Sequence, residues 1–526
     1  MINSGFKPWI YWYSSPGIKD GTVGIKAGKY RFLSEKQVQD LDHAAKEILS
    51  RTGVKIPNET CLQLLEKAGA TVDFKKIHVK IPPSLVDEAI RKTPKSFRFG
   101  GRDPKKAITI DKEHSYFVHG IGPYLVQPDG SMRKSTLKDM QDYYRVLDAC
   151  ENVDVAGIPV GGTTSTPQEN MELPLSVRRL RKYLMMLDLM EKPVDTSRTF
   201  VVDTDDEAGS VRQAALDQIQ MEIAVRGSLE ELQKTPMSLG FNEAVSPLMY
   251  LPRNLEKLLV YAEHGLPMFI GSGPMTNATG PATMAGTLAL WLAETLAGLV
   301  IGYLAGDPEH LPPALWMCFT GLFDQLSAHG PIMGSPEGTL VQSACANIAH
   351  HYGFPIRGCI GSPSKALDPQ AGYETATALL TSVMAGVNYH VSIGTVGPGE
   401  AGVSLEKIVL DNELAGYIKR IMQGIEVNEE TIAVDVIDEV GPGGSYLIHP
   451  HTRKWFRKEQ YFPRLFDRRK YEDWVRRGKK DAVKRATERV QEILRDHWPE
   501  PLDKDIRKRI EDHVKMVEKR EAKSKR

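Results

Sequence analysis

Carboxylate and aromatic side chains follow several short apolar runs of the sequence, where strands are expected to end. The stretch LGFNEAVSPL contributes Phe241, Asn242 and Glu243, and FTGLFDQLSAHG contributes Phe323 and Asp324. An aromatic ring facing a quaternary ammonium stabilises it by about 0.5–2 kcal/mol, and a nearby carboxylate adds Coulombic attraction. These residue types in this pattern predict a binding site for an organic cation.

The stretch from 331 to 402 holds most of the remaining polar side chains of interest. Glu337 lies in MGSPEG at the start of a predicted helix, and Tyr389 lies in the apolar run VNYHVSI. The loop after the run PIRGCI contains Ser362, Ser364, Lys365, Asp368, Gln370, Tyr373 and Glu374. Each of these residues alone is also a good helix cap or turn former, and Ser362, Ser364 and Asp368 are especially suited to capping.

Alternating strand and helix patterns indicate how these side chains are positioned. Apolar runs fall at 153–160, 193–196, 235–241, 266–272, 314–320, 355–360 and 387–393, and another strand is expected near 431–436. Helical patterns lie between them, which is typical of parallel βα units. The favoured fold class is α/β, as a TIM-type (β/α)₈ barrel, and a doubly wound open sheet is the second choice. Both place active sites at the carboxyl ends of their strands.

The flanking regions differ from this central pattern. Residues 1–115 are expected to form an N-terminal helical region, with helices in LSEKQVQDLDHAAKEILSRTG, NETCLQLLEKAGA and PPSLVDEAIRKTP. Residues 116–445 are assigned to the barrel, and 446–526 to a C-terminal helical extension. The segment 114–132, with its turn signals, is expected to be hairpin-like.

Composition narrows the class of protein. The 526 residues include 67 basic and 67 acidic side chains, so no net positive charge favours nucleic acid or an anionic membrane. Five scattered cysteines and the lack of a signal-peptide pattern predict a cytoplasmic location. The run 284–306 is long enough for a membrane span and has one charge, Glu294. Its Gly, Ala and Thr content and its neighbours favour a buried helix instead.

Metal and nucleotide motifs are weak. His350 and His351 are adjacent, so on a helix they point about 100° apart, and His449 and His451 lack a nearby completing ligand. GxGxxG, GxxxxGK[ST] and GxSxG motifs are missing. We therefore predict no protein-ligated metal. The aromatic and basic C-terminal region also carries acidic residues, which favours a solvated helical face or a protein-docking surface over nucleic-acid binding.

Several longer motifs resemble one known family. They are RKSTLKDMQDYYRVLDACENVDV, MGSPEG, HHYGFPIRG, SKALDPQAGYE, MAGVNYHVSIGTV, SLEKIVLDNE and GGSYLIHPHTRKWFRKEQYFPRLFDRR. Over nearly the whole chain, and in order, the sequence is similar to the trimethylamine methyltransferase (MttB) superfamily. The resemblance implies a TIM barrel that passes a methyl group from an amine to the cobalt of a separate corrinoid protein.

The resemblance also bears on the substrate. The founding members carry a pyrrolysine in the barrel, which would fall near Ser362, whereas this loop has ordinary residues throughout. Members without pyrrolysine resemble demethylases of quaternary amines such as glycine betaine, proline betaine, carnitine or γ-butyrobetaine. A quaternary nitrogen that loses a methyl group leaves as a neutral amine, so no general acid is needed. Holding the N–methyl bond in line with the cobalt and excluding water are then the enzyme's main tasks.

These arguments predict a methyltransferase that uses a small quaternary amine and the Co(I) of a partner corrinoid protein, without a tightly bound cofactor of its own. A homo-oligomer is expected. Glu243 and Asp324 are the predicted catalytic residues, and His351 and Arg357 are expected to meet a substrate carboxylate. The remaining predicted site residues are Phe241, Asn242, Phe323, Glu337 and Tyr389 around the substrate, and Ser362, Lys365, Asp368 and Gln370 in the loop over it.

Two other functions remain open at this stage. A betaine-binding or regulatory protein would keep the aromatic cage but lack a productive opening toward a corrinoid partner. A different methylated-amine enzyme, acting on trimethylamine or using its own bound cofactor, would be expected to copurify with that cofactor.

Overall fold

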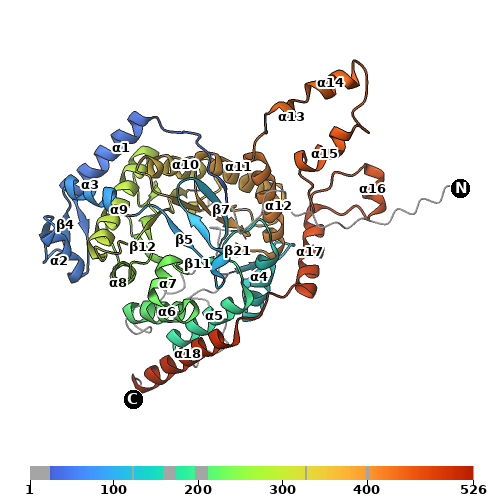
Figure 1. Ribbon diagram of the computed structural model, residues 1–526. Coiled ribbons are helices and arrows are strands. Elements are labelled where there is room, and N and C mark those ends of the chain that lie inside the picture. Colours follow the sequence, from blue (N-terminus) through green and yellow to red (C-terminus); the bar gives the residue numbers. More distant parts are fainter. Residues whose placement is uncertain are drawn as a thin grey trace.

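The structure is a computed structural model that describes residues 24–120, 124–157, 173–195, 211–325, 329–359, 361–397 and 402–524 (Figure 1). It is a mixed α/β protein. A central sheet contains seven strands in the order β1-β7-β19-β18-β15-β13-β12. Their bounds are β1 Ile25–Lys26, β7 His114–His119, β12 Gly240–Ala244, β13 Met268–Ser272, β15 Ala314–Cys318, β18 Ile356–Cys359 and β19 Tyr389–Ile393. All neighbouring pairs are parallel except β1 with β7.

Two further parallel strands extend this sheet beyond β7. Strand β10 (Ala156–Gly157) pairs with β11 (Val194–Asp195), and a parallel bridge from Val118 to Val155 joins them to β7. The resulting order is β12, β13, β15, β18, β19, β7, β10, β11. Strands of this set that follow one another along the chain are neighbours in this order, except β11 and β12 at its two ends, and the last strand, β19, lies beside the first, β7. Among the described residues, no pairing joins β11 to β12.

On one face of the sheet, side chains from different strands pack against one another. Side chains from β12, β13, β15, β19 and β7, together with Val155, form a single apolar cluster. The hairpin of β5 (Phe97–Phe99) and β6 (Ile108–Ile110) completes it, and no helix residue belongs to it. Because both ends of the sheet contribute to this cluster, the sheet curves around it. A doubly wound sheet has helices on both faces, so the second-choice fold is wrong.

Helices cover the opposite face (Figure 1). They are α4 Leu137–Ala149, α5 Leu175–Leu189, α6 Val211–Arg226, α7 Leu229–Lys234, α8 Pro252–Glu263, α9 Met284–Ala305, α10 Pro336–His351, α11 Pro369–Ala385 and α12 Leu405–Met422. By length and composition α9 could cross a membrane, but 83% of its most apolar window is buried inside the protein. The prediction of a buried helix at this position is therefore confirmed.

Three predicted N-terminal helices are confirmed as α1 (Glu35–Glu47), α2 (Glu59–Lys67) and α3 (Pro83–Lys92). Ser34 forms a capping box with Gln37 at the start of α1, as its sequence position predicts. The three helices pack against the outer side of α9, near the small sheet of β2 (Val54–Lys55), β3 (Thr71–Asp73) and β4 (His78–Lys80).

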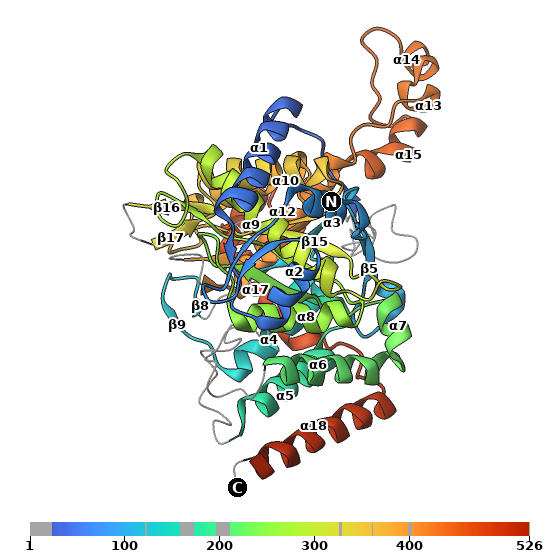
Figure 2. The same cartoon turned by 90° about the vertical axis from the view of Figure 1, so that its left-hand side faces the viewer.

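The loops at the carboxyl ends of the strands form small sheets. Strands β14 (Met275–Thr276), β16 (Gly321–Asp324) and β17 (His329–Ile332) make one sheet. Strands β8 (Tyr124–Val126), β9 (Met132–Lys134), β20 (Thr395–Val396) and β21 (Gly402–Val403) make another. In Figure 2 the labelled strands β16, β17, β8 and β9 lie on one side of the molecule and β5 on the other.

One expectation about strands is confirmed in part, and another is wrong. Within the segment 114–132, expected to be hairpin-like, β8 pairs antiparallel with β9, whereas the first part is β7, a central strand that pairs in parallel with β19. The strand expected near 431–436 is replaced by the short helices α13 (Glu429–Ile432) and α14 (Val434–Val440). Asn428 forms a capping box at the start of α13, a local signal that favours the start of a helix here.

The C-terminal region is helical, as predicted. Its helices are α15 (Pro450–Glu459), α16 (Tyr471–Arg476), α17 (Ala482–Asp496) and α18 (Lys504–Ser524). Helix α17 packs on α12 and α4, and α18 packs on α5 and α6. By contrast, α13, α14 and α15 project away from the rest of the molecule in both views (Figures 1 and 2).

Candidate functional site

A row of paired residues crosses the concave face of the sheet. The pairs run from Glu243 to Gly271, Met317, Arg357 and Tyr389, each on the next strand. Residues paired in register across parallel strands point to the same side of a sheet. Met317 and Tyr389 belong to the interior cluster, so Glu243 and Arg357 face the interior as well.

Glu243 lies near the carboxyl end of its strand. A Cβ placed on Gly273 would be 3.4 Å from Glu243 Oε1 and 3.0 Å from the carbonyl oxygen of Phe319. The carboxylate therefore lies where β13 and β15 end. Phe241, two residues earlier on the same strand, belongs to the interior cluster and is 3% exposed. The strand thus presents one ring and one carboxylate to the interior.

Arg357 is a buried cation in the same interior. It is 3% exposed, and its guanidinium carbon lies 5.5 Å from the centroid of the Phe269 ring. Its Nε and Nη1 atoms are buried and have no hydrogen-bond partner among the residues that the structure describes. Leaving a buried charged donor unpaired is costly. The arrangement therefore suits an anion, and a carboxylate matches the forked geometry of a guanidinium.

Tyr389 and Phe269 form the aromatic part of the interior. Their ring centroids are 6.0 Å apart with an interplanar angle of 70°. Burial raises the pKa of Tyr389 well above its usual range, nearby Asp195 raises it further, and Arg357 opposes this. Tyr389 therefore stays protonated at neutral pH. Asp195, the last residue of β11, adds a second carboxylate to the interior group.

The loop after Glu243 is anchored by the buried carboxylate of Glu294. Glu294 accepts hydrogen bonds from the backbone N–H of Leu248 (2.7 Å) and the hydroxyl of Ser246 (2.8 Å). Burial raises the pKa of Glu294, and these donors oppose the increase. The one charge of the apolar helix α9 thus holds the β12 loop in place.

Two predicted site residues lie away from this interior. Asn242 faces outward, because a Cβ on Gly298 of α9 would be 3.1 Å from its Nδ2 atom. His351 is exposed at the end of α10 that leads into the amino end of β18, and its ring contacts Tyr352. Neither position agrees with the prediction that these residues contact the same substrate as Glu243.

Three predicted residues lie in outer layers. Phe323 and Asp324 are half-buried in β16, within the small sheet that follows β13 and β15. Glu337 is exposed in the first turn of α10, where a carboxylate favours the helix dipole. Their direct contact with a substrate stays a prediction.

The loop between β18 and α11 is held by its own side chains. Ser362 donates to Glu374 (2.5 Å), and Ser364 donates to Asp368 (2.9 Å). Asp368 caps α11 by accepting from the N–H of Ala371 (3.0 Å), and this bond lowers the pKa of the carboxyl. The capping interpretation of Asp368 is therefore confirmed.

The other predicted residues of that loop are more peripheral. Gln370 donates to the second oxygen of Glu374 (2.9 Å) and is exposed, as is Lys365. The N–H of Gly397 donates to the carbonyl oxygen of Ser364 (2.7 Å), which ties the loops after β18 and β19 together. Whether these side chains touch the substrate stays a prediction.

Two interior residues were absent from the predicted set. Phe269 lies two positions before Gly271 on β13, and this spacing puts both on one face. Asp195 directly follows Val194 in a short apolar run, where a strand-end carboxylate was a usable signal. Both could have been found by applying the two-residue period to every predicted strand.

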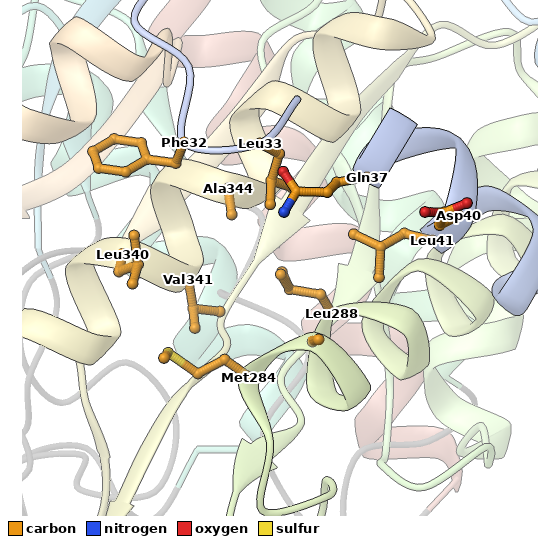
Figure 3. Close-up of a pocket in the computed structure, with 11 residues that line it drawn as sticks. Phe32, Leu33, Gln37, Asp40, Leu41, Met284, Leu288, Leu340, Val341 and Ala344 are labelled. Carbon is orange, nitrogen blue, oxygen red and sulfur yellow. The ribbon is translucent and has the colours of Figure 1, made fainter. Parts of the chain in front are cut away.

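Other possible sites in the described residues are less suited to binding a charged substrate than the interior of the sheet. Within the described ranges, no group of three or more His, Cys, Asp and Glu side chains is placed to hold a metal ion. A surface groove of about 360 Å³ lies between α1, α9 and α10 (Figure 3). Its lining is mostly apolar, with Asp40 as its one charged residue, and it shares no residue with the interior cluster.

Comparison with known proteins identifies the family. The family model described as trimethylamine methyltransferase (MTTB) matches residues 18–524. The chain belongs to this family. It is therefore a methyltransferase, and the resemblance inferred from the motifs is confirmed.

Individual relatives carry different substrate names. A glycine betaine methyltransferase of Desulfitobacterium hafniense is 32% identical over 486 residues, covering 92% of this chain and 96% of the relative. A trimethylamine methyltransferase MttB of the same species is 30% identical over 507 residues, covering 95% and 97%. The crystal structure of the Methanosarcina barkeri monomethylamine methyltransferase is similar with a TM-score of 0.45 and 12% identity, covering 94% of this chain and 95% of that one.

Proposed function

We propose that the protein transfers a methyl group from a small quaternary amine that carries a carboxylate, such as glycine betaine, to a corrinoid protein. The observation that carries this proposal is the buried guanidinium of Arg357, whose Nε and Nη1 atoms have no hydrogen-bond partner within the described part of the chain. Trimethylamine has no group that would pair with this cation, whereas every betaine does. The serine at position 362 supports a reaction without pyrrolysine.

The spacing of Glu243 and Arg357 suits a zwitterion. They are three strands apart in one row, which corresponds to about 14 Å along the sheet. Their long side chains and the curvature of the sheet reduce the gap between the two charged ends. In this arrangement the substrate carboxylate pairs with Arg357, and its ammonium lies toward Glu243.

The role of these residues in the reaction is to position the substrate. The partner's corrinoid would supply cobalt(I) as the nucleophile: a cobalt–carbon bond to the methyl group would form as the N–methyl bond breaks, and the nitrogen would keep the electron pair of the broken bond and become neutral. Because the cation disappears, a very strong carboxylate clamp would oppose the reaction. Glu243 is half-buried and lies beside the loops at the strand ends, which suits moderate attraction. Arg357 and Phe269 hold the rest of the molecule in place.

We also propose that the sheet closes into a (β/α)₈ barrel through β11 and β12. The cyclic strand order supports closure, since β19 lies beside β7. Helix α6 packs against α8 on the outside of the seam. There, the carboxylate of Glu222 accepts from Ser238 (2.9 Å), and Ser238 also bonds the Tyr261 hydroxyl (2.7 Å). This buried network links the helices on either side of the seam.

The proposed boundaries follow the sequence interpretation. Residues 116–445 would form the barrel domain between an N-terminal region, 1–115, and a C-terminal extension, 446–526. Strand β7 begins at His114 and the last helix of the repeating pattern, α12, ends at Met422. A cytoplasmic location fits the burial of α9.

Methyl transfer across a substrate panel tests the proposed function. The purified protein is mixed with a cobalt(I) corrinoid and with glycine betaine, carnitine, tetramethylammonium or trimethylamine, and methyl-cobalt formation is followed by absorbance. Transfer from a carboxylate-bearing quaternary amine supports the proposal. Calorimetric binding of a betaine without any transfer would instead favour a binding or regulatory protein. Copurification of a cofactor required for turnover would favour a different methylated-amine enzyme that uses its own bound cofactor.

A further inference from the structure

The arm formed by residues 425–459 is unusually exposed and apolar. Its helices α13, α14 and α15 contain no buried residue, and the arm projects from the body (Figures 1 and 2). Within the described residues, 23 large apolar side chains are exposed, and nine of them lie in this arm. The most exposed are Ile425 (83%), Leu447 (83%) and Ile448 (93%). A patch of this kind marks an interaction surface.

The first half of the arm is also strongly acidic. Residues 426–440 carry six carboxylates and no lysine or arginine. The two ion pairs formed by these acids stay inside the arm, from Glu430 to Lys454 and from Glu439 to His449. Asp435 and Asp438 are exposed on α14 and form no salt bridge with any residue that the structure describes. An acidic, apolar segment therefore extends into solvent without pairing to the body of its own chain.

A basic cleft lies near the base of the arm. It has a volume of about 380 Å³ and is lined by Gln460, residues 462–469 and Arg485. Four arginines and one aspartate contribute, and Phe462 and Phe466 supply apolar surface. Arg468 donates to the carbonyl oxygen of Tyr461 and the hydroxyl of Tyr417, and it forms no salt bridge. The cleft thus has the complementary charge and the apolar character that the arm requires.

We propose that the acidic segment 425–440 of one copy binds in the basic cleft of a second copy. Both surfaces are present on every chain, so two copies would exchange arms across a twofold axis and make the same contact twice. Charge complementarity would fix the register of the arm, and burial of Ile425, Val427, Val434 and Ile437 would supply the apolar contact. This inference does not depend on the proposed substrate.

Two pairs of charge reversals test the exchange in the full-length chain. The arm variant is Asp435→Lys with Asp438→Lys, and the cleft variant is Arg468→Glu with Arg469→Glu; all four residues are exposed. Sedimentation velocity measures the mass of each protein and of the two variants mixed. A matched control reverses two exposed acids elsewhere, Glu47→Lys with Glu66→Lys.

The wild type and the control are expected to sediment as assemblies with at least twice the 58.6 kDa chain mass. For each charge-reversed variant, the dissociation constant of the assembly is expected to be at least 10-fold higher than for the wild type. Mixing the two variants is expected to restore the assembly, because each reversed arm then meets a reversed cleft. Restoration also shows that both variants are folded.

Three outcomes would overturn the proposal. A monomeric wild type would mean that the arm serves a different partner, such as the corrinoid protein. An assembly unchanged by both reversals would place the interface elsewhere. Failure of the mixture to reassemble, with recovery when all four reversals are combined in one chain, would mean that the arm binds the cleft of its own chain.

Discussion

Glu243 and Arg357 lie in one row of paired residues, three strands apart, and both side chains face the concave side of the sheet. One is a half-buried carboxylate near the strand ends, and the other is a buried guanidinium beside Phe269. Among the described residues, Glu243 forms no salt bridge with Arg357, and Arg357 Nε and Nη1 lack hydrogen-bond partners. This is the arrangement that a zwitterionic substrate would need.

Replacing Arg357 by Met should weaken binding of carboxylate-bearing amines selectively. A charge-assisted pair contributes about 1.5–3 kcal/mol, so Kd for glycine betaine is expected to rise about 10- to 150-fold. Arg357→Lys keeps the charge without the planar fork and should lie in between. Calorimetric titration measures both, with tetramethylammonium as the control ligand. An equal loss for both ligands would show that Arg357 is merely structural.

Glu243→Gln should lower kcat/KM more than Asp324→Asn does. The first change removes a charge from the interior row, whereas Asp324 lies in the small outer sheet. We expect a loss of about 10-fold for Glu243→Gln, equivalent to ~1.4 kcal/mol of transition-state stabilisation. Steady-state kinetics on both variants tests this order. If both stay within about twofold of the wild type, the assignment of these carboxylates is wrong.

Glu294→Leu should impair activity by releasing the loop that follows Glu243. The change removes the acceptor for Leu248 N–H and for the Ser246 hydroxyl. Losing one such bond costs about 1–3 kcal/mol, so a fall of about 10-fold in kcat/KM is expected. Glu294→Gln retains one acceptor oxygen and is the matched control. Equal activity of the two variants would disprove the anchoring role.

His390 should make the protein less stable in acid. Its side chain is fully buried, and burial lowers its pKa to about 3 from the usual 6.5. Between these values the unfolded chain binds a proton and the folded chain does not, so stability falls as the pH falls through this range. From pH 7.5 to 5.0 the expected contribution is about 2 kcal/mol of unfolding free energy.

The variant His390→Phe tests that contribution. Urea unfolding at both pH values should show a smaller loss for the variant than for the wild type, even if the variant is less stable at pH 7.5. The same loss in both proteins would mean that His390 does not titrate on unfolding.

Most helices and strands were predicted correctly, because the signals that start and stop them come from residues close by in the sequence. Asp368, predicted to suit a helix cap, caps the helix Pro369–Ala385, since capping depends on neighbours in sequence. The pairing of β7 with β19 joins residues more than 270 positions apart, and nothing near His114 encodes it. The turn-rich sequence after β7 predicted a hairpin, and that hairpin forms between β8 and β9.

The sequence predicted only part of the site, because which face of a strand a residue lies on depends on the three-dimensional register. Successive residues of a strand face opposite sides, so Phe241, Asn242 and Glu243 were never able to line one cavity together. Likewise, Glu337 and His351 are separated by about 21 Å along α10. Residue type indicated the chemistry, but the choice of face and helix end needed the three-dimensional register.

The most direct test of the proposed function compares two substrates at equal concentration with the wild-type protein and cobalt(I) corrinoid. The initial rate of methyl-cobalt formation is measured with glycine betaine and with trimethylamine. A quaternary-amine enzyme whose Arg357 binds a carboxylate should methylate cobalt from glycine betaine and show no rate above background with trimethylamine. Faster transfer from trimethylamine would contradict the proposal.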